Sequence, residues 1–389
     1  MNSLKQQRGE SCLKVGISLY GPLLSEAGAR FASQLGVEDV VVHLTDYGRN
    51  ADASAYAAGG VVGPINGECI DAPLWSYDRL TDLVAMLSRH NLRVAALENI
   101  SPNFWSDILL DGPKKDAQMQ DLQDLVRNMG RLGIPVLGYN FSIAGVWGWQ
   151  RKPVARGNAV TAVFAIDEFD AESPVPDGMV GNMRYRLAVP GAKPQTVDEA
   201  TLWSRLHWFL EKLLPVAEES RVRLAAHPDD PPVERLRGTA RLVNSHAKYD
   251  RLLSLVESPA NALEFCVGSL AEMPDGDVYE ATRRFARRNA IAYVHFRNVR
   301  GKVPNYVETF VDDGDVDMAR IVRVLHEEGY DGILVPDHVP ELECPAPWHA
   351  GHAYTIGYMK ALVAHADALT RSSSGSAGHR AEEPSAAAE

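Results

Sequence analysis

The chain has 389 residues, of which 46% are hydrophobic, a size and composition that suit one large α/β domain with insertions or two ordinary domains. Its formal net charge of −12, with acidic and basic residues interspersed, argues against nucleic acid as a partner. Four cysteines without CxxC spacing, no signal-peptide pattern and no run of roughly 18 apolar residues predict a cytoplasmic protein with no membrane partner.

Short apolar runs alternate with amphipathic stretches along the chain, a pattern typical of β/α units in a parallel sheet. Between the runs, segments such as 77–90, 116–132 and 316–328 carry apolar residues every three or four positions and are expected to be helices. Eight strands alternating with helices favour a (β/α)8 TIM barrel over a doubly wound sheet, and no strand is followed by G-x-G-x-x-G. The predicted strands are 13–19, 39–44, 92–97, 135–141, 222–226, 262–266, 292–296 and 332–336.

Several segments do not follow this alternation of strands and helices. Residues 46–71, after the second strand, are rich in Gly and Ala and are expected to form a loop over the barrel mouth. Residues 147–199, after the fourth strand, carry many Pro and Gly residues and are expected to form a lid-like insertion without a second core. The catalytic barrel then spans 11–370, between a flexible N-terminus at 1–10 and a polar, Ser- and Ala-rich tail at 371–389 that we expect to be disordered.

Potential metal ligands end the last four predicted strands. They are His227, Cys266, His295 and Asp337. Taken singly, a histidine near a strand end or a buried cysteine more often serves packing or hydrogen bonding than metal binding. In a barrel, however, consecutive strand ends meet at one face, so four donors there at once predict a metal site. Imidazoles and a thiolate suit Mn²⁺, Fe²⁺, Co²⁺ or Zn²⁺ better than Mg²⁺ or Ca²⁺.

Other polar residues at the same strand ends fit an oxygen-rich anionic substrate. Arg297 could clamp a carboxylate bidentately, the alternative being a surface ion pair. His338 is a candidate general acid or base, the alternative being a support for its neighbours. Glu98 and Asn140 could bind substrate hydroxyl groups, or could stabilise the barrel rim.

Several segments of the sequence resemble the mannonate dehydratase family. The resemblance implies a xylose-isomerase-like TIM barrel and a metal, usually Mn²⁺, bound at the positions of the four predicted ligands. It also implies that D-mannonate, an intermediate of hexuronate catabolism, is dehydrated to 2-keto-3-deoxy-D-gluconate, so the expected partner is a small sugar-acid substrate. The matching segments are AAHPDDPP (225–232), SPANALEFCVGSL (258–270), HFRNV (295–299), DDGDVDM (312–318) and GYDGILVPDH (329–338).

The sequence departs from the family pattern around the expected site. The first strand reads ISLYG, where the family has Arg and Trp before Tyr-Gly, and residues 142–151 (SIAGVWGWQR) replace an Asp-Trp-x-Arg pattern. In the divergent segment after His338, Tyr354 stands in for a catalytic tyrosine of the family. Two alternatives therefore stay open: a metal-dependent sugar isomerase or epimerase, and a non-catalytic homologue that binds a sugar acid. Arg297 favours the lyase, since a neutral sugar needs no carboxylate clamp; a homo-oligomer is also open.

Overall fold

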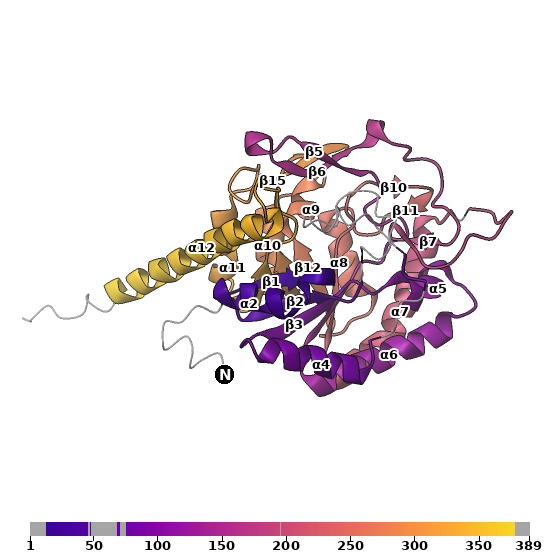
Figure 1. Ribbon diagram of the computed structural model, residues 1–389, viewed down its shortest axis with the longest axis horizontal. Helices are drawn as coiled ribbons and strands as arrows, with labels where there is room; N and C mark the ends of the chain where they lie inside the picture. The colour runs from indigo at the N-terminus through magenta and orange to yellow at the C-terminus, as the bar shows by residue number, and fades with distance from the viewer. Residues whose placement is uncertain (1–12, 46, 48–67, 71–74, 195, 378–389) are drawn as a thin grey trace, which may run out of the picture.

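Eight parallel strands close into a barrel in the computed structural model, which describes residues 13–45, 47, 68–70, 75–194 and 196–377 (Figure 1). The strands follow one another around the barrel in chain order, and each corresponds to one predicted from the sequence. The prediction of a TIM barrel is therefore confirmed. The barrel strands are β1 (Lys14–Leu19), β2 (Asp39–His43), β3 (Arg93–Glu98), β4 (Val136–Tyr139), β9 (Arg223–Ala226), β12 (Asn261–Cys266), β13 (Ile291–His295) and β16 (Ile333–Val335).

Helices surround the barrel and bury a continuous apolar layer against it. A smaller group of side chains, among them Val41, Ala225 and Tyr293, fills the barrel interior. The longer helices are α2 (Glu26–Gln34), α4 (Tyr77–Ser88), α6 (Lys115–Leu132), α7 (Glu199–Ser220), α8 (His246–Leu255), α10 (Val278–Arg287), α11 (Met318–Glu327) and α12 (Pro347–Ala377). Shorter ones are α5 (Ser106–Leu110), α9 (Val267–Glu272) and the 3-10 turns η1 (Gly21–Leu23), η2 (Pro102–Phe104), η3 (Arg156–Asn158) and η4 (Ile166–Glu168).

Helix α6 illustrates how the sequence sets these elements. Its buried residues Met119, Leu122, Val126 and Met129 recur every three or four positions and form one apolar stripe. Gly133 follows with a φ of 72°, a left-handed conformation that glycine adopts without strain, so the helix ends and the chain turns into β4. The stripe packs against the barrel, and this packing fixes where β4 emerges at the mouth.

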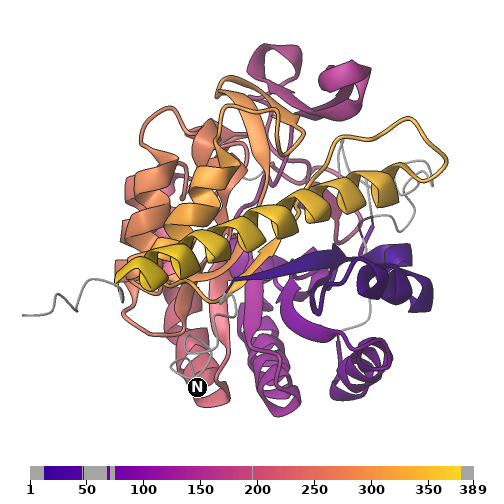
Figure 2. The same ribbon diagram turned by 90° about the vertical axis from the view of Figure 1, so that its left-hand side faces the viewer.

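A four-stranded antiparallel sheet lies beyond the barrel strands at one end of the molecule; we call it the accessory sheet (Figures 1 and 2). Its order is β14-β15-β6-β5, so a hairpin that follows β13 pairs with strands of the insertion after β4. The bounds are β5 (Trp149–Pro153), β6 (Val160–Ala165), β14 (Asn298–Lys302) and β15 (Asn305–Thr309). Two-stranded pairs complete the inserts: β7 (Met179–Val180) with β8 (Met183–Arg184), and β10 (Arg235–Leu236) with β11 (Thr239–Ala240).

The accessory sheet has a small core of its own, which corrects the expectation that the insertion lacks one. Trp149, Ala162, Phe164 and Tyr306 are buried together there. The physical reason is the hairpin: Tyr306 stacks on Phe164 with ring centroids 5.5 Å apart, so the insertion completes its core with residues from beyond β13. The insertion is thus attached to the barrel along a strand edge.

The C-terminal helix α12 extends well beyond the barrel (Figure 1). It reaches Ala377, so the first residues of the tail predicted to be disordered from 371 are helical instead. Adding a residue to an existing helix gains one hydrogen bond, which lets a polar segment continue it. The predicted flexible N-terminus and nearly all of the predicted loop at 46–71 lie outside the described residues.

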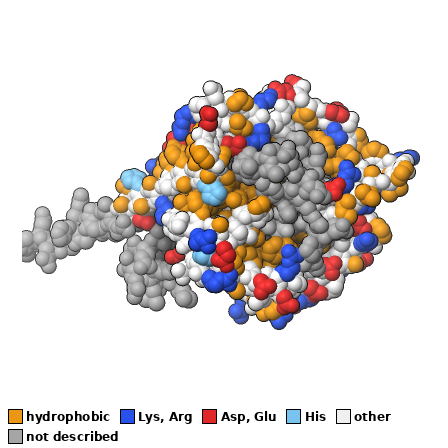
Figure 3. Space-filling model, viewed as in Figure 1, with side chains coloured by type: hydrophobic (Ala, Val, Ile, Leu, Met, Phe, Trp, Pro, Cys, Tyr) orange, Lys and Arg blue, Asp and Glu red, His pale blue; other side chains and the backbone are white. Residues whose placement is uncertain are grey.

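One face of the described surface agrees with the interspersed charges of the sequence. Acidic and basic side chains are intermixed on the face shown in Figure 3, which has no large area of one sign. Within the part of the chain that the structure describes, no helix combines the length and apolarity needed to cross a membrane.

Candidate functional site

Three of the predicted metal ligands meet at the carboxyl ends of adjacent barrel strands. Cys266 ends β12, His295 ends β13 and His227 directly follows β9, and one donor atom from each lies within 4.8 Å of the other two. Asp337, two residues after β16, places its Oδ2 3.6 Å from His295 Nδ1 and 3.9 Å from Cys266 Sγ. The barrel therefore brings all four predicted ligands together.

Neighbouring groups orient the two imidazoles. His227 Nδ1 lies 2.6 Å from the Pro228 carbonyl oxygen, so Nδ1–H donates there and Nε2 is the nitrogen left for Cys266. His295 Nε2 lies 3.2 Å from Glu98 Oε2 and 3.3 Å from Glu264 Oε1, which leaves Nδ1 facing Cys266 and Asp337. A carboxylate behind an imidazole fixes its tautomer in this way at many metal centres. The arrangement fits a divalent cation.

The charges at the site favour the ionised forms of the two acidic ligands, Cys266 and Asp337. Burial by itself would raise the pKa of the Cys266 thiol, but the Arg297 guanidinium and hydrogen bonds from His227 and His295 lower it to about 5. Burial opposes ionisation of Asp337 too, yet His338, His295 and Arg297 hold the pKa of that carboxyl well below its usual range. A thiolate and a carboxylate are thus present at neutral pH, and these are the forms that bind metal.

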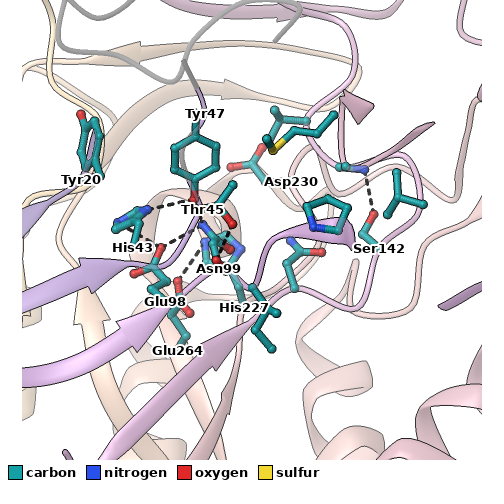
Figure 4. A pocket seen from close by; sticks show the side chains of 18 of the residues that line it. Tyr20, His43, Thr45, Tyr47, Glu98, Asn99, Ser142, His227, Asp230 and Glu264 are labelled. Carbon is teal, nitrogen blue, oxygen red and sulfur yellow. Dashed lines mark hydrogen bonds and ion pairs between the residues drawn. The ribbon is translucent and has the colours of Figure 1, made fainter. Parts of the chain in front are cut away.

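A pocket opens beside this cluster; His227 and Asp337 line it, while Cys266 and His295 are buried and do not. Polar side chains on one part of its wall come from the ends of β2 and β3, where His43, Tyr47 and Asn99 gather around Glu98 (Figure 4). His43 Nδ1 lies 2.9 Å from Tyr47 Oη, and His43 Nε2 lies 3.5 Å from Glu98 Oε1. Further lining residues are polar (Tyr20, Thr45, Asn140, Ser142, His227, Asp230, Glu264, Asp337, His338) or apolar (Ile100, Trp105, Val146, Trp149, Val180, Met183).

Comparison with known proteins identifies the family. A model of the D-mannonate dehydratase (UxuA) family matches residues 47–372. The chain belongs to this family. The mannonate dehydratase of Shouchella clausii (strain KSM-K16) is 32% identical over 287 residues, which cover 68% of this chain and 77% of that protein. The mannonate dehydratase of Lactococcus lactis subsp. lactis (strain IL1403) is 28% identical over 326 residues, covering 75% of this chain and 88% of that protein.

Solved structures agree on the fold. The crystal structure of mannonate dehydratase from Streptococcus suis serotype 2 superposes with a TM-score of 0.69 at 25% identity, covering 92% of this chain and 96% of that one. The structure of an L-ribulose 3-epimerase gives a TM-score of 0.54 at 14% identity, covering 95% of this chain and 100% of the other. At that identity the second likeness shows the barrel fold alone.

Arg297 is not placed to bind a substrate carboxylate. Its side chain has no exposed surface and forms ion pairs with Asp230, Glu272, Glu308 and Asp337. It is absent from the pocket wall. The prediction that Arg297 binds the substrate carboxylate is corrected, because protein carboxylates already surround the guanidinium. Its N–H groups instead contact protein groups, among them Asp337 and Cys266.

Tyr354 also lies away from the pocket, which corrects its assignment as a catalytic residue. It sits on α12, 39% exposed, with its hydroxyl 3.4 Å from an Arg156 guanidinium nitrogen and its ring against Phe310. The physical reason is the course of the chain after β16, which starts α12 at Pro347 and directs Tyr354 towards the outer surface. No match to the catalytic tyrosine of the family is therefore supported at this residue.

The remaining predicted residues are all at the pocket. His338, Glu98 and Asn140 line it together with Asp337. Two further residues at the site, Glu264 and His43, were not predicted from the sequence. Each carried a signal: Glu264 is a charge within the apolar run ALEFC, two residues before Cys266 and so on the same face of the strand, and His43 ends the run DVVVH.

Proposed function

We propose that this chain is a metal-dependent hydro-lyase that dehydrates a sugar acid in the cytoplasm, with D-mannonate as the first substrate to test and 2-keto-3-deoxy-D-gluconate and water as products. The observation that carries the proposal is the convergence of His227, Cys266, His295 and Asp337 under a pocket, in a chain of the D-mannonate dehydratase family. The relatives named mannonate dehydratase support the choice of substrate.

The donor set supports Mn²⁺ as the metal, with Fe²⁺ and Co²⁺ as alternatives. His227, Cys266, His295 and Asp337 would hold the ion, and two imidazoles, a thiolate and a carboxylate together suit a cation of intermediate softness. When bound, a divalent cation supplies positive charge beside the substrate oxygens while the proton leaves C2 and an enediolate develops.

We assign to the chain's own residues the binding and the proton transfer. His338 lines the pocket next to Asp337, and we assign to it both proton transfers: it takes the proton that leaves C2 and gives a proton to the departing C3 hydroxyl, which leaves as water. Asn140 lines the pocket with an amide able to meet substrate hydroxyl groups. Glu98 lines it too, but its carboxylate lies beside His43 and His295, so we assign it first to orienting these imidazoles.

One observation favours a second candidate, a metal-dependent sugar isomerase or epimerase. Among the described residues that line the pocket, none is Arg or Lys. With Arg297 surrounded by carboxylates, the argument that a cationic clamp favours an acidic substrate over a neutral sugar no longer holds. A substrate carboxylate would depend on the metal and on uncharged donors such as Asn140.

A substrate panel tests the proposal. Purified protein with Mn²⁺ is incubated with D-mannonate, other aldonates and aldoses, and the products are followed by detection of 2-keto-3-deoxy acids and by NMR. Formation of a 2-keto-3-deoxy acid from D-mannonate supports the lyase. Exchange between aldose and ketose, without dehydration, would establish the second candidate instead. Metal binding without turnover of any compound would indicate a non-catalytic sugar-acid-binding homologue.

A further inference from the structure

We propose that Glu308 is a positioning residue for His338, and that the accessory sheet orients this proton-transfer group as well as covering the pocket. The inference rests on the proposed function, in which His338 moves a proton at the substrate. Glu308 lies on β15, on a hairpin that the sequence did not predict, and it is 1% exposed.

Glu308 lies between an imidazole and a guanidinium. Its Oε1 lies 3.0 Å from His338 Nδ1 and also accepts a hydrogen bond from the Arg297 guanidinium. Arg297 Nη1 is itself 3.4 Å from His338 Nδ1. Two nitrogen donors this close repel each other unless an acceptor lies between them, and Glu308 provides that acceptor. Without it, the contact between His338 and Arg297 becomes unfavourable.

The same face of the accessory sheet contacts His338 a second time. Trp149 on β5 and Tyr306 on β15 both pair with Phe164 on β6, so the three form one row across the sheet. The Trp149 indole meets the His338 ring edge to face, with centroids 4.9 Å apart and an interplanar angle of 88°.

A chain of hydrogen bonds ties this row to the barrel. Trp149 Nε1 donates to Tyr306 Oη at 2.8 Å, and Tyr306 Oη donates to Asp230 Oδ1 at 2.6 Å. Asp230 in turn pairs with Arg297. The indole that contacts His338 is therefore fixed relative to the metal-ligand cluster.

These contacts hold the imidazole in one orientation. With Nδ1 donating to Glu308, the nitrogen left for the pocket is Nε2, which lies 3.4 Å from Asp337 Oδ1. Removing the Glu308 carboxylate leaves Nδ1 without its acceptor and beside the guanidinium, so the ring is free to turn away from the substrate. We therefore expect the rate of proton transfer to fall while substrate binding is unchanged.

A kinetic comparison tests this role. We expect Glu308→Ala to lower kcat by about 10- to 100-fold at unchanged KM and metal content, by analogy with the loss typical when an outer-shell partner of a metal-ligating imidazole is removed. Glu308→Gln keeps an acceptor oxygen for Nδ1 and should recover most of the lost kcat. The matched control is Glu168→Ala, because Glu168 forms an exposed ion pair with Lys152 of the same sheet and should leave kcat unchanged.

A spectroscopic measurement tests the inference without turnover. In protein loaded with diamagnetic Zn²⁺, the His338 Nδ1 proton should give a low-field NMR signal, identified by its absence in His338→Gln. The signal should disappear in Glu308→Ala, move to higher field in Glu308→Gln and stay in Glu168→Ala. A signal that keeps its position in a folded Glu308 variant would overturn the inference, as would wild-type kcat in Glu308→Ala. A wild-type protein that dehydrates no aldonate contradicts the proposed function, while the NMR result still decides the role of Glu308.

Discussion

Cys266 is the least common of the four ligands and the one that most narrows the chemistry of the site. Its thiolate lies at a strand end beside Arg297, which donates to Sγ at 3.5 Å. The ligand set was predictable from sequence because each donor ends a recognisable apolar run. The role of Arg297 was not, because its charge partners Asp230, Glu272 and Glu308 come from three other segments, and sequence spacing does not show that they surround it.

Removal of the thiolate should weaken metal binding at the site. We expect Cys266→Ala to lose at least tenfold in Mn²⁺ affinity and in dehydratase activity, because one charged ligand of four is gone. Metal content after dialysis and turnover of D-mannonate measure both. The control is Cys344→Ala, since Cys344 is exposed. Full metal content in Cys266→Ala would exclude the proposed ligand set.

The Arg297 side chain should contribute strongly to stability. Arg297→Met leaves Asp230, Glu272 and Glu308 buried without their shared cation, and breaking a buried pair in this way costs about 3–5 kcal/mol. Urea unfolding measures the difference. Arg300→Met is the comparison, because Arg300 forms an ion pair with Asp313 while its side chain stays 55% exposed, and such pairs contribute about 0–1 kcal/mol. Equal losses in the two variants would contradict this assignment of Arg297.

The secondary-structure elements differ in how well they could be predicted from the sequence. The barrel strands are buried and read as apolar runs, so all eight could be predicted. The hairpin of β14 and β15 has the sequences NVRGK and NYVET. It contains a mixture of charged and small residues because it is partly exposed. Its pairing with β6 depends on a contact far along the chain, which local periodicity does not show. The accessory sheet was therefore missed although the insertion was found.

Helix α12 carries a histidine whose burial links stability to pH. The His352 ring stacks on Trp348 with centroids 4.0 Å apart, and burial lowers the pKa of His352 to about 3 from its ordinary 6.5. The folded state keeps this ring neutral while the unfolded state takes up a proton below pH 6.5. Its contribution to stability is therefore complete above pH 6.5 and falls as the pH drops towards 3.

The effect of pH can be isolated with a variant. Between pH 7 and pH 5 the wild type should lose about 2 kcal/mol more unfolding free energy than His352→Gln, which has no ring to protonate. Urea unfolding at the two pH values measures this. His207→Gln, at an exposed histidine of α7, should keep the wild-type dependence. The same slope in His352→Gln and wild type would show that His352 is not the responsible group.

Metal binding should stabilise the whole molecule. The ligands lie at or just after the carboxyl ends of β9, β12, β13 and β16, so a bound ion links one half of the barrel. An ion bound only by the folded state adds about 2.7 kcal/mol at a concentration 100 times its Kd. We expect the melting temperature to rise with added Mn²⁺ in the wild type and in Cys344→Ala, measured by calorimetry. A similar rise in Cys266→Ala would place the ion elsewhere.

The joining of β6 to β15 in the accessory sheet has a consequence for the order of folding. The chain between these two strands contains three barrel strands, β9, β12 and β13, and closing so long a loop costs entropy that other contacts must offset. The sheet should therefore be among the last parts to assemble. Refolding followed by circular dichroism should precede the return of activity, so catalysis reports that the whole chain, and not the barrel alone, has reached its native state.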